Sequence, residues 1–371
     1  MNSFRTAGEI VTGNGSLSSL GERAAALGSK ALLVTGRSAM RKAGVTDRAL
    51  VSLEEAGVAA VAFERVEHDP DVATVDAGRE VRRREGCDVV IGLGGGSAID
   101  AAKAIAGLAN EEAPTREFHQ GRPIAAPAIP LIAIPTTSGT GAEVTKNAVL
   151  SDRELKVKKS IRAEAMMPAV AIVDPELTLT CPPRVTAASG MDALVQAIEA
   201  FTSIHATAIT DALAFDAACR LARWLPVAYE DGSNLEAREH CAMGSLMAGM
   251  ALANSRLGAV HGIAHPLGAR YGLEHGVVCG LLMPHVMKLN RPFVGDKYER
   301  LSAAVGEDIV GLVERLVERF GLKKALEGVV IPREDFPAIV AESMPSGSLK
   351  ANAKKITEGD VEAILTAFVE G

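Results

Sequence analysis

Aromatic residues are scarce in this 371-residue chain, at 4% of the total with one tryptophan and three tyrosines. A core without them must be aliphatic, and the 48% of hydrophobic residues supplies enough aliphatic side chains for one. No basic tail or block of like charge is present, and the formal net charge is −7. This acidic balance argues against nucleic acid or an anionic membrane as a partner.

Cysteine pairs at redox or metal-ligand spacing are also absent. The five cysteines are scattered, odd in number and never spaced as CxxC, which is typical of free thiols in a reducing compartment. The N-terminus lacks the apolar core of a signal peptide, and no uninterrupted apolar run has membrane-spanning length. We therefore expect a soluble cytoplasmic protein.

Short apolar runs alternate with helical patterns through the first half of the chain. Four runs have the length and composition of buried parallel strands: residues 31–35, 59–63, 88–92 and 131–134. Helical patterns follow the second and third runs, from about Val72 to Glu85 and over residues 98–110. This alternation predicts an α/β fold with a parallel, Rossmann-like sheet covered by helices on both faces.

The strand signal fades after residue 177, and the second half is helical throughout. Five segments have helical periodicity without β-branched runs: residues 187–202, 206–229, 235–256, 276–290 and 308–320. We place the boundary near Cys181–Pro183, which predicts an α/β domain over residues 1–180 and an all-α domain over residues 181–371.

Two loops rich in glycine and hydroxyl groups follow the third and fourth predicted strands. The first contains Gly92, Gly94 and Ser97, a near match to GxGxxG, and the second is the run PTTSGTG at 135–141. Such loops let backbone N–H groups and a helix N-terminus surround a phosphate. A single loop of this kind is weak evidence, but two in one sheet predict phosphate or dinucleotide binding.

The end of the first predicted strand bears on the choice of dinucleotide. Sites selective for NAD usually carry an acidic residue near the ribose, whereas a 2′-phosphate needs room and an arginine. Here Gly36 and Arg37 stand at the strand end, with Arg41 one turn later and no acidic residue beside them. We predict NADP(H), with NAD(H) as the alternative if the two arginines are merely solvated.

Three of the eight histidines lie within the stretch Gly258–Gly276. His261 and His265 are four residues apart and share one face of a helix, which we expect Pro266 to kink or end. Glycines after the proline let the chain turn back, so that His275 can approach the same point. Imidazoles that converge in this way favour a divalent transition metal.

A carboxylate for this site is expected from the helical segment 187–202. Asp192, Gln196 and Glu199 are spaced i, i+4 and i+7 on one face of an apolar helix, and a polar row on a buried face needs a reason. Asp192 is the candidate ligand. We expect Glu199 to cap or pair elsewhere.

Five motifs in order resemble the iron-dependent (group III) alcohol dehydrogenases over nearly the full length of the chain. They are GGGS at 94–97 with Asp100, PTTSGTGAEVT at 135–145, DPEL at 174–177, GMDAL at 190–194 and HGIAHPLGARYGLEHG at 261–276. The resemblance implies the dehydroquinate synthase-like architecture, with an N-terminal nucleotide-binding domain, a C-terminal helical metal-binding domain and an active site in the cleft between them.

The resemblance also implies site residues. The cofactor set is Gly36, Arg37, Asp69, Gly95, Gly96, Ser97, Asp100, Thr136, Thr137, Asn147, Lys158 and Leu177. Gly36 stands where NAD-using relatives often have an aspartate. Asp69 stands where the family commonly has an asparagine.

For the metal, the resemblance implies Asp192, His261 and His275 as ligands and His265 as the catalytic, non-ligand histidine near the substrate. The remaining family ligand is a histidine, and this chain has Gln196 at that position. An amide oxygen is a neutral and weaker donor than imidazole. The predicted metal is Fe²⁺ or Zn²⁺, held less tightly than a full set would hold it.

The predicted function is metal-dependent hydride transfer between NADPH and a small aldehyde or ketone, by a homodimer or higher homo-oligomer. The alternative is metal-independent reduction, as in the maleylacetate reductases, because of Gln196. Two histidines and a carboxylate also occur in non-haem iron oxygenases, but those have no use for the glycine loops. Dehydroquinate synthases use different motifs, and a non-catalytic nucleotide-binding protein would show no NADPH turnover.

Overall fold

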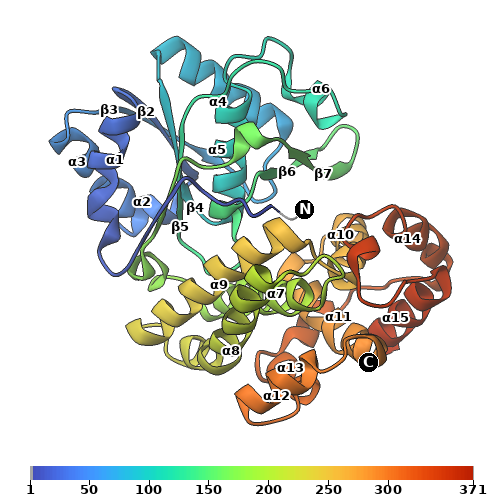
Figure 1. The fold of residues 1–371 in the computed structure, drawn as a ribbon. Helices are drawn as coiled ribbons and strands as arrows, with labels where there is room; N and C mark the ends of the chain where they lie inside the picture. Colours follow the sequence, from blue (N-terminus) through green and yellow to red (C-terminus); the bar gives the residue numbers. More distant parts are fainter. Residues whose placement is uncertain (1–2, 371) are drawn as a thin grey trace. The chain divides into compact units, whose positions relative to one another are not determined.

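The computed structural model describes residues 3–370, which form two compact units. One contains residues 6–137 and 141–181 with all the strands of the described chain, and we call it the sheet unit. The other contains residues 3–5, 138–140 and 182–370, and we call it the helical unit. The predicted fold class, a parallel-sheet α/β part with a mostly helical part, is confirmed (Figure 1).

Six parallel strands form the main sheet in the order β1-β8-β5-β4-β2-β3. Their bounds are β1 Glu9–Thr12, β2 Lys30–Gly36, β3 Ala59–Val66, β4 Val89–Gly94, β5 Leu131–Pro135 and β8 Val170–Val173. The chain adds β3 on one side of β2 and then crosses over to add β4 on the other side. Ligands of open parallel sheets bind outside the carboxyl ends of the strands at such a reversal, here between β2 and β4.

Helices cover both faces of this sheet because its central strands are apolar on both sides. In β2, Ala31 and Leu33 belong to one core with α1 and α3, whereas Leu32 and Val34 belong to another with α4 and α5. The helices of the sheet unit are α1 Leu20–Leu27, α2 Ala39–Lys42, α3 Val45–Glu55, α4 Val72–Glu85, α5 Gly96–Gly107 and α6 Thr115–His119. The predicted doubly covered sheet is therefore present.

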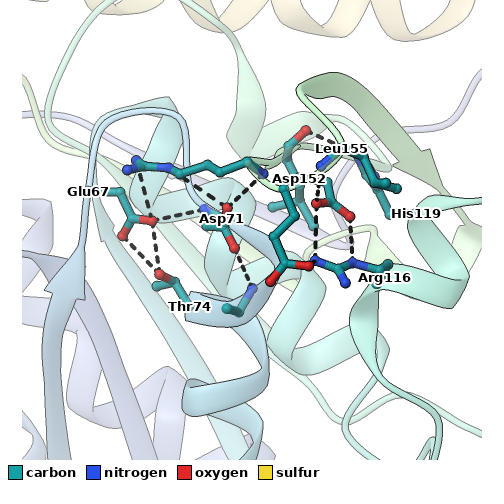
Figure 2. Close-up of polar contacts among 11 residues, drawn as sticks. Glu67, Asp71, Thr74, Arg116, His119, Asp152 and Leu155 are labelled. Carbon is teal, nitrogen blue, oxygen red and sulfur yellow. Dashed lines mark hydrogen bonds and ion pairs between the residues drawn. The ribbon is translucent and has the colours of Figure 1, made fainter.

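An antiparallel hairpin of β6 (Asn147–Asp152) and β7 (Val157–Arg162) was not predicted from the sequence. Strand β6 alternates partly buried with buried residues, whereas β7 is mostly exposed or partly buried, and short strands of this kind resemble loops in a sequence pattern. Part of the hairpin is attached to the start of α4. The Asp71 carboxylate accepts from the backbone N–H of Arg153 at 3.1 Å, and Glu67 accepts from that of Asp71 at 2.9 Å (Figure 2).

Helix α6 holds the same hairpin through polar contacts. Nε of Arg116 donates to the buried carboxylate of Asp152 at 2.6 Å, and Nε2 of His119 lies 3.0 Å from the Leu150 carbonyl oxygen (Figure 2). These bonds fix the position of a hairpin that has few apolar side chains. Two predicted cofactor residues, Asn147 and Lys158, lie on it.

The helical unit contains all five helices predicted for the second half. Its helices are α7 Pro183–Thr202, α8 Ala208–Glu230, α9 Leu235–Ser255, α10 Ala259–Tyr271, α11 His275–Asn290, α12 Lys297–Val305, α13 Ile309–Arg319, α14 Phe336–Ser343 and α15 Glu358–Glu370. Small residues allow close packing: a Cβ on Gly190 of α7 would lie 2.1 Å from Cδ1 of Leu225 on α8. Within residues 3–370, no helix combines the length and apolarity needed to cross a bilayer.

The prediction that Pro266 could end its helix is wrong. Helix α10 continues through the proline to Tyr271 and stops at Gly272, which takes the left-handed conformation with φ 65°. Proline removes one backbone hydrogen bond, but Ile263 and Leu267 on either side of it are fully buried. Packing of these side chains stabilises the helix against that loss.

Candidate metal centre and dinucleotide site

The two predicted glycine loops leave neighbouring strands at one edge of the sheet. Gly95 is the N-cap of α5 and makes no side-chain bond to the helix N-terminus, which leaves N–H groups available to an anion. A Cβ on Gly95 would lie 3.5 Å from Oγ1 of Thr137, and the backbone N–H of Thr136 donates to the Gly94 oxygen at 3.0 Å. The loops therefore form one cradle, lined by Gly95, Gly96, Ser97, Thr136 and Thr137.

Gly36 ends β2, which pairs with β4. A Cβ on Gly36 would meet only the Val66 oxygen, at 3.8 Å, so the space beside the strand end is open. Arg37 is exposed. Arg41 is already engaged, because its Nε and Nη2 donate to the Glu64 carboxylate at 3.0 and 2.8 Å. Of the two arginines, Arg37 is the one available to a phosphate.

Three other predicted cofactor residues form a charged group beside the first loop. Nζ of Lys158 lies 2.7 Å from Oδ1 of Asp69, whose backbone N–H donates to Oγ of Ser97 at 3.3 Å. Asp69 has a φ of 53°, a left-handed conformation that asparagine and aspartate tolerate better than most residues. Burial raises the pKa of Asp100 to about 6, against the opposing charge of Lys103.

The last two predicted cofactor residues have contacts within the fold. Asn147 begins β6, and its backbone oxygen accepts from the buried ammonium of Lys103 at 3.0 Å. Leu177 lies in a 3₁₀ turn after β8 and is buried in the core that contains α1 and α3. Their role toward a cofactor stays a prediction.

Four possible metal ligands converge within the helical unit. Asp192 lies on α7, His261 on α10, His275 is the first residue of α11, and Cys279 lies one turn further along α11. One donor atom from each lies within 4.8 Å of all the others. Oδ1 of Asp192 is 3.2 Å from Nε2 of His261 and 3.7 Å from Nε2 of His275. The three side chains predicted to converge therefore do so.

Glu199 contacts His261 at Nδ1, the ring nitrogen that does not face Asp192. Its Oε2 lies 2.7 Å from Nδ1 of His261, and its Oε1 accepts from the backbone N–H of Val260 at 2.7 Å. A carboxylate on Nδ1 keeps a proton there and leaves the Nε2 lone pair directed at the other donors. These contacts agree with the expectation that Glu199 caps or pairs and is not itself a ligand: it caps the start of α10 and pairs with His261.

Gln196 contacts Asp192 through its nitrogen. Nε2 of Gln196 donates to Oδ2 of Asp192 at 2.9 Å, which leaves Oδ1 of Asp192 facing the histidines. Oε1 of Gln196 is buried and has no hydrogen-bond partner among the described residues. Buried oxygens without a partner are uncommon and costly. The Asp192 carboxylate, the unpartnered Gln196 oxygen and the two imidazoles are all groups that can donate electron pairs to a cation.

The charges within this group are strongly coupled. Burial raises the pKa of Asp192, but the hydrogen bond with His261 and the charges of both imidazoles bring its net pKa below the ordinary value. Burial likewise raises the pKa of Cys279, and the charges of His275 and His261 bring it below the ordinary value. The charges of the imidazoles thus lower the pKa of both the Asp192 carboxyl and the Cys279 thiol, against the opposing effect of burial.

His265, the predicted catalytic histidine, lies outside the four-donor group. It is exposed on α10, one turn after His261, and its ring stacks on that of His275 with centroids 5.1 Å apart. An exposed imidazole beside buried ligands can exchange protons with water.

Cys279 is the member of the donor group that was not predicted from the sequence. Cys279 follows His275 by four residues, which puts both on one face of the helix that was predicted there. That spacing was the available signal.

Comparison with known proteins identifies the relatives of this chain. Residues 7–175 match the family model of iron-containing alcohol dehydrogenase, and residues 186–369 match the C-terminal model of the same family. The chain is 38% identical over 366 residues to 1,3-propanediol dehydrogenase of Klebsiella pneumoniae, with 95% of each chain covered.

Two solved structures are similar along their whole length. The crystal structure of a 1,3-propanediol oxidoreductase has a TM-score of 0.94 at 36% identity, covering 99% of this chain and 100% of that one. Sulfoacetaldehyde reductase from Bifidobacterium kashiwanohense, in complex with NAD⁺, has a TM-score of 0.93 at 30% identity, covering 100% and 99%.

Proposed function

We propose, from the premise that this chain belongs to the iron-containing alcohol dehydrogenase family, that it reduces a small aldehyde or ketone with NADPH at a metal centre. Family membership makes the protein an alcohol dehydrogenase or aldehyde reductase. The preferred dinucleotide, the metal and the roles of individual residues are our proposals.

One observation carries the metal part of this proposal. Oδ1 of Asp192 and the Nε2 atoms of His261 and His275 face one another within a buried pocket, and Oε1 of Gln196 is unpartnered beside them. We propose that Asp192, His261 and His275 hold Fe²⁺ or Zn²⁺, with Gln196 at the edge of the set. When bound, the metal supplies a Lewis acid that polarises the substrate carbonyl.

The chain itself binds and orients the dinucleotide, which supplies the hydride. N–H groups at the start of α5 and the Thr136–Thr137 loop bind its phosphates. Open space at Gly36 and the exposed guanidinium of Arg37 accommodate a 2′-phosphate, and this supports NADPH over NADH. The hairpin contributes Lys158 and Asn147 to the proposed cofactor residues. Lys158 is paired with Asp69, which lies beside the first glycine loop.

We propose that His265 donates the proton that completes reduction. Its imidazole is exposed, so water can reprotonate it, and it stacks on the ligand His275. Imidazole is suited to this task at neutral pH. His265→Gln should lower kcat by about 10²-fold or more while metal content stays unchanged.

A cytoplasmic location and a homo-oligomer belong to the proposal as well. All five cysteines are free thiols, as expected in a reducing compartment. In the described sheet β1 pairs with β8 alone, which leaves its outer edge available to a second copy. Light scattering of the purified protein measures the number of subunits directly.

The test of the proposed function is metal content combined with turnover. About one metal per chain is expected, with NADPH-dependent aldehyde reduction lost on chelation and restored by Zn²⁺ or Fe²⁺. Asp192→Ala should abolish turnover and leave NADPH binding, measured by cofactor fluorescence, nearly unchanged. Turnover retained in this variant would refute the metal role.

A metal-independent reduction is the alternative that Gln196 favours. In that case the histidines would polarise the carbonyl by hydrogen bonding. Full activity after exhaustive chelation, with no metal detected, would establish this alternative in place of the first.

A further inference from the structure

The position that carries an imidazole ligand in the family carries Gln196 here, and a thiol occupies the other side of the same pocket. Cys279 is fully buried on α11, one helical turn after His275. Its Sγ lies 3.6 Å from Nε2 of His275, the nitrogen that also faces Oδ1 of Asp192 at 3.7 Å. The thiol therefore points toward the centre of the donor group.

We infer that Cys279 is the fourth protein ligand of the metal, and that Asp192, His261, His275 and Cys279 form a site selective for Zn²⁺ over Fe²⁺. This inference rests on the metal-binding part of the proposed function and specifies it further. It assigns Gln196 to holding the Asp192 carboxylate instead of to metal binding.

The distances match a tetrahedral zinc site. Bonds of about 2.0–2.1 Å to nitrogen or oxygen and about 2.3 Å to sulfur put such ligand atoms roughly 3.3 Å apart, and a sulfur roughly 3.6 Å from each of them. The Nε2 atoms of His261 and His275 lie 3.2 and 3.7 Å from Oδ1 of Asp192. The sulfur of Cys279 lies 3.6 Å from Nε2 of His275. Only small movements would bring all four onto one ion.

Charge balance favours the same set. A divalent ion held by Asp192 and two neutral imidazoles keeps one positive charge in a pocket whose Asp192 and His261 side chains are 5% and 3% exposed. A thiolate from Cys279 cancels that charge, and uncompensated buried charge is costly. The amide of Gln196 is neutral and cannot do so.

The contacts of Gln196 agree with a positioning role. Its amide nitrogen donates to Oδ2 of Asp192 and so directs Oδ1 of that carboxylate at the two imidazoles. Glu199 acts in the same way on His261. Such hydrogen bonds orient metal ligands and strengthen their binding.

A substrate could still reach a metal that is held by four protein ligands. The His275 side chain is 30% exposed, whereas those of Asp192 and His261 are nearly inaccessible, so one side of the set faces solvent. Catalytic zinc can take a fifth ligand as the reaction proceeds. Thiolate ligands suit zinc, and a nitrogen and sulfur site generally binds Zn²⁺ more tightly than Fe²⁺.

The test uses the full-length protein stripped of metal and loaded with Co²⁺ or Zn²⁺. Cobalt-loaded wild type should show a near-ultraviolet thiolate-to-cobalt charge-transfer band, and X-ray absorption of the zinc form should show one sulfur at about 2.3 Å. Cys279→Ser should lose the band and bind Zn²⁺ at least tenfold more weakly in chelator competition. Its Zn²⁺ over Fe²⁺ preference should fall as well.

Cys241→Ser is the matched control. Cys241 is buried in the same unit on α9, and burial raises the pKa of its thiol to about 12, so it is not a thiolate. This variant should keep the band and the zinc affinity. A second variant, Cys279→Ser with Gln196→His, should regain zinc affinity through the new imidazole without regaining the band.

The outcomes separate this inference from the proposed function. One metal per wild-type chain and chelator-sensitive turnover, without a charge-transfer band or a sulfur neighbour, would overturn the ligand role of Cys279 and leave the proposed function standing. A wild type that binds neither ion and still turns over would overturn both the inference and the metal role. The spectrum of the wild-type protein alone can overturn the ligand role of Cys279, so the test remains valid even if the Cys279→Ser variant does not fold.

Discussion

Gly36 leaves open space at the end of β2, where we propose that the ribose of the dinucleotide binds. A Cβ on Gly36 would meet no atom closer than the Val66 oxygen at 3.8 Å, so a larger residue fits there without moving the backbone. The same position therefore allows a clean test of cofactor choice.

Gly36→Asp should reverse the preference between the dinucleotides. A carboxylate at this strand end repels a 2′-phosphate and can accept a hydrogen bond from a 2′-hydroxyl. We expect kcat/KM for NADPH to fall at least tenfold relative to that for NADH, about 1.4 kcal/mol. Steady-state kinetics with both cofactors measure this ratio. Gly347→Asp is the control, because Gly347 likewise has no positive φ and has open space around a Cβ, but lies in the helical unit. An unchanged ratio would show that the 2′ position lies elsewhere.

Single substitutions among the proposed metal ligands and their partners should disturb the whole group. Asp192 has one oxygen held by Gln196 and the other facing the imidazoles, so each neighbour restricts its orientation. His261 is similarly held by Glu199. Loss of one partner leaves a buried charge or donor unpaired, which costs more than the bond contributed.

At the scale of elements, the hairpin β6–β7 depends on a short helix for its position. His119 on α6 reaches the carbonyl oxygens of Leu150 in β6 and Lys159 in β7, at 3.0 and 3.2 Å. Two acceptors at one nitrogen require a proton on Nε2. Burial lowers the pKa of His119 below the ordinary 6.5, more than its backbone hydrogen bonds raise it.

This histidine should make stability decrease in acid. The folded protein binds the proton less tightly than the unfolded chain, so its contribution is present above pH 6.5 and is lost as the pH falls through the lower folded pKa. His119→Gln keeps a donor toward Leu150 without a titrating ring. Between pH 7 and pH 5 its Tm should fall less than that of wild type, by a few degrees. An equal fall in both proteins would contradict the assignment.

At the scale of the whole molecule, the residues proposed to bind the dinucleotide and those proposed to bind the metal lie mostly in different compact units. The predicted dinucleotide loops lie in the sheet unit apart from residues 138–140, and the donor cluster lies in the helical unit. Each ligand should stabilise the unit that binds it, because binding to the native state alone shifts the folding equilibrium.

Hydrogen exchange can measure this separation. With free ligand at about 100 times Kd, stabilisation is about 2.7 kcal/mol, or roughly a hundredfold slower exchange for amides that open with their unit. Zinc should protect α7, α10 and α11, and NADPH should protect the segments after β4 and β5. In the Asp192→Ala variant the zinc effect should vanish and the NADPH effect should remain. Equal protection of both units by either ligand would show instead that they unfold as one body.

Much of the fold follows from local patterns in the chain. The apolar runs at β2, β4 and β5 and the five long helices were predicted because period and composition act over neighbouring residues. The hairpin β6–β7 was missed, since its charged strands owe their structure to distant contacts with Asp71, Arg116 and His119. The end of α10 was misplaced for the same reason: burial outweighed the local effect of Pro266.

Residue patterns and motifs predicted the family, the alternation of strands and helices, and a site shared by Asp192, His261 and His275. Tertiary structure alone decided which groups complete that site. Glu199 is 62 residues from His261, and Cys279 is 87 residues from Asp192. Helical spacing places Glu199 on the face of Asp192 and Cys279 on the face of His275, but it does not show which other helix that face meets. Only the packing of α7 against α10 and α11 brings a carboxylate, a thiol and two imidazoles into one low-dielectric pocket, where their charges act strongly on one another.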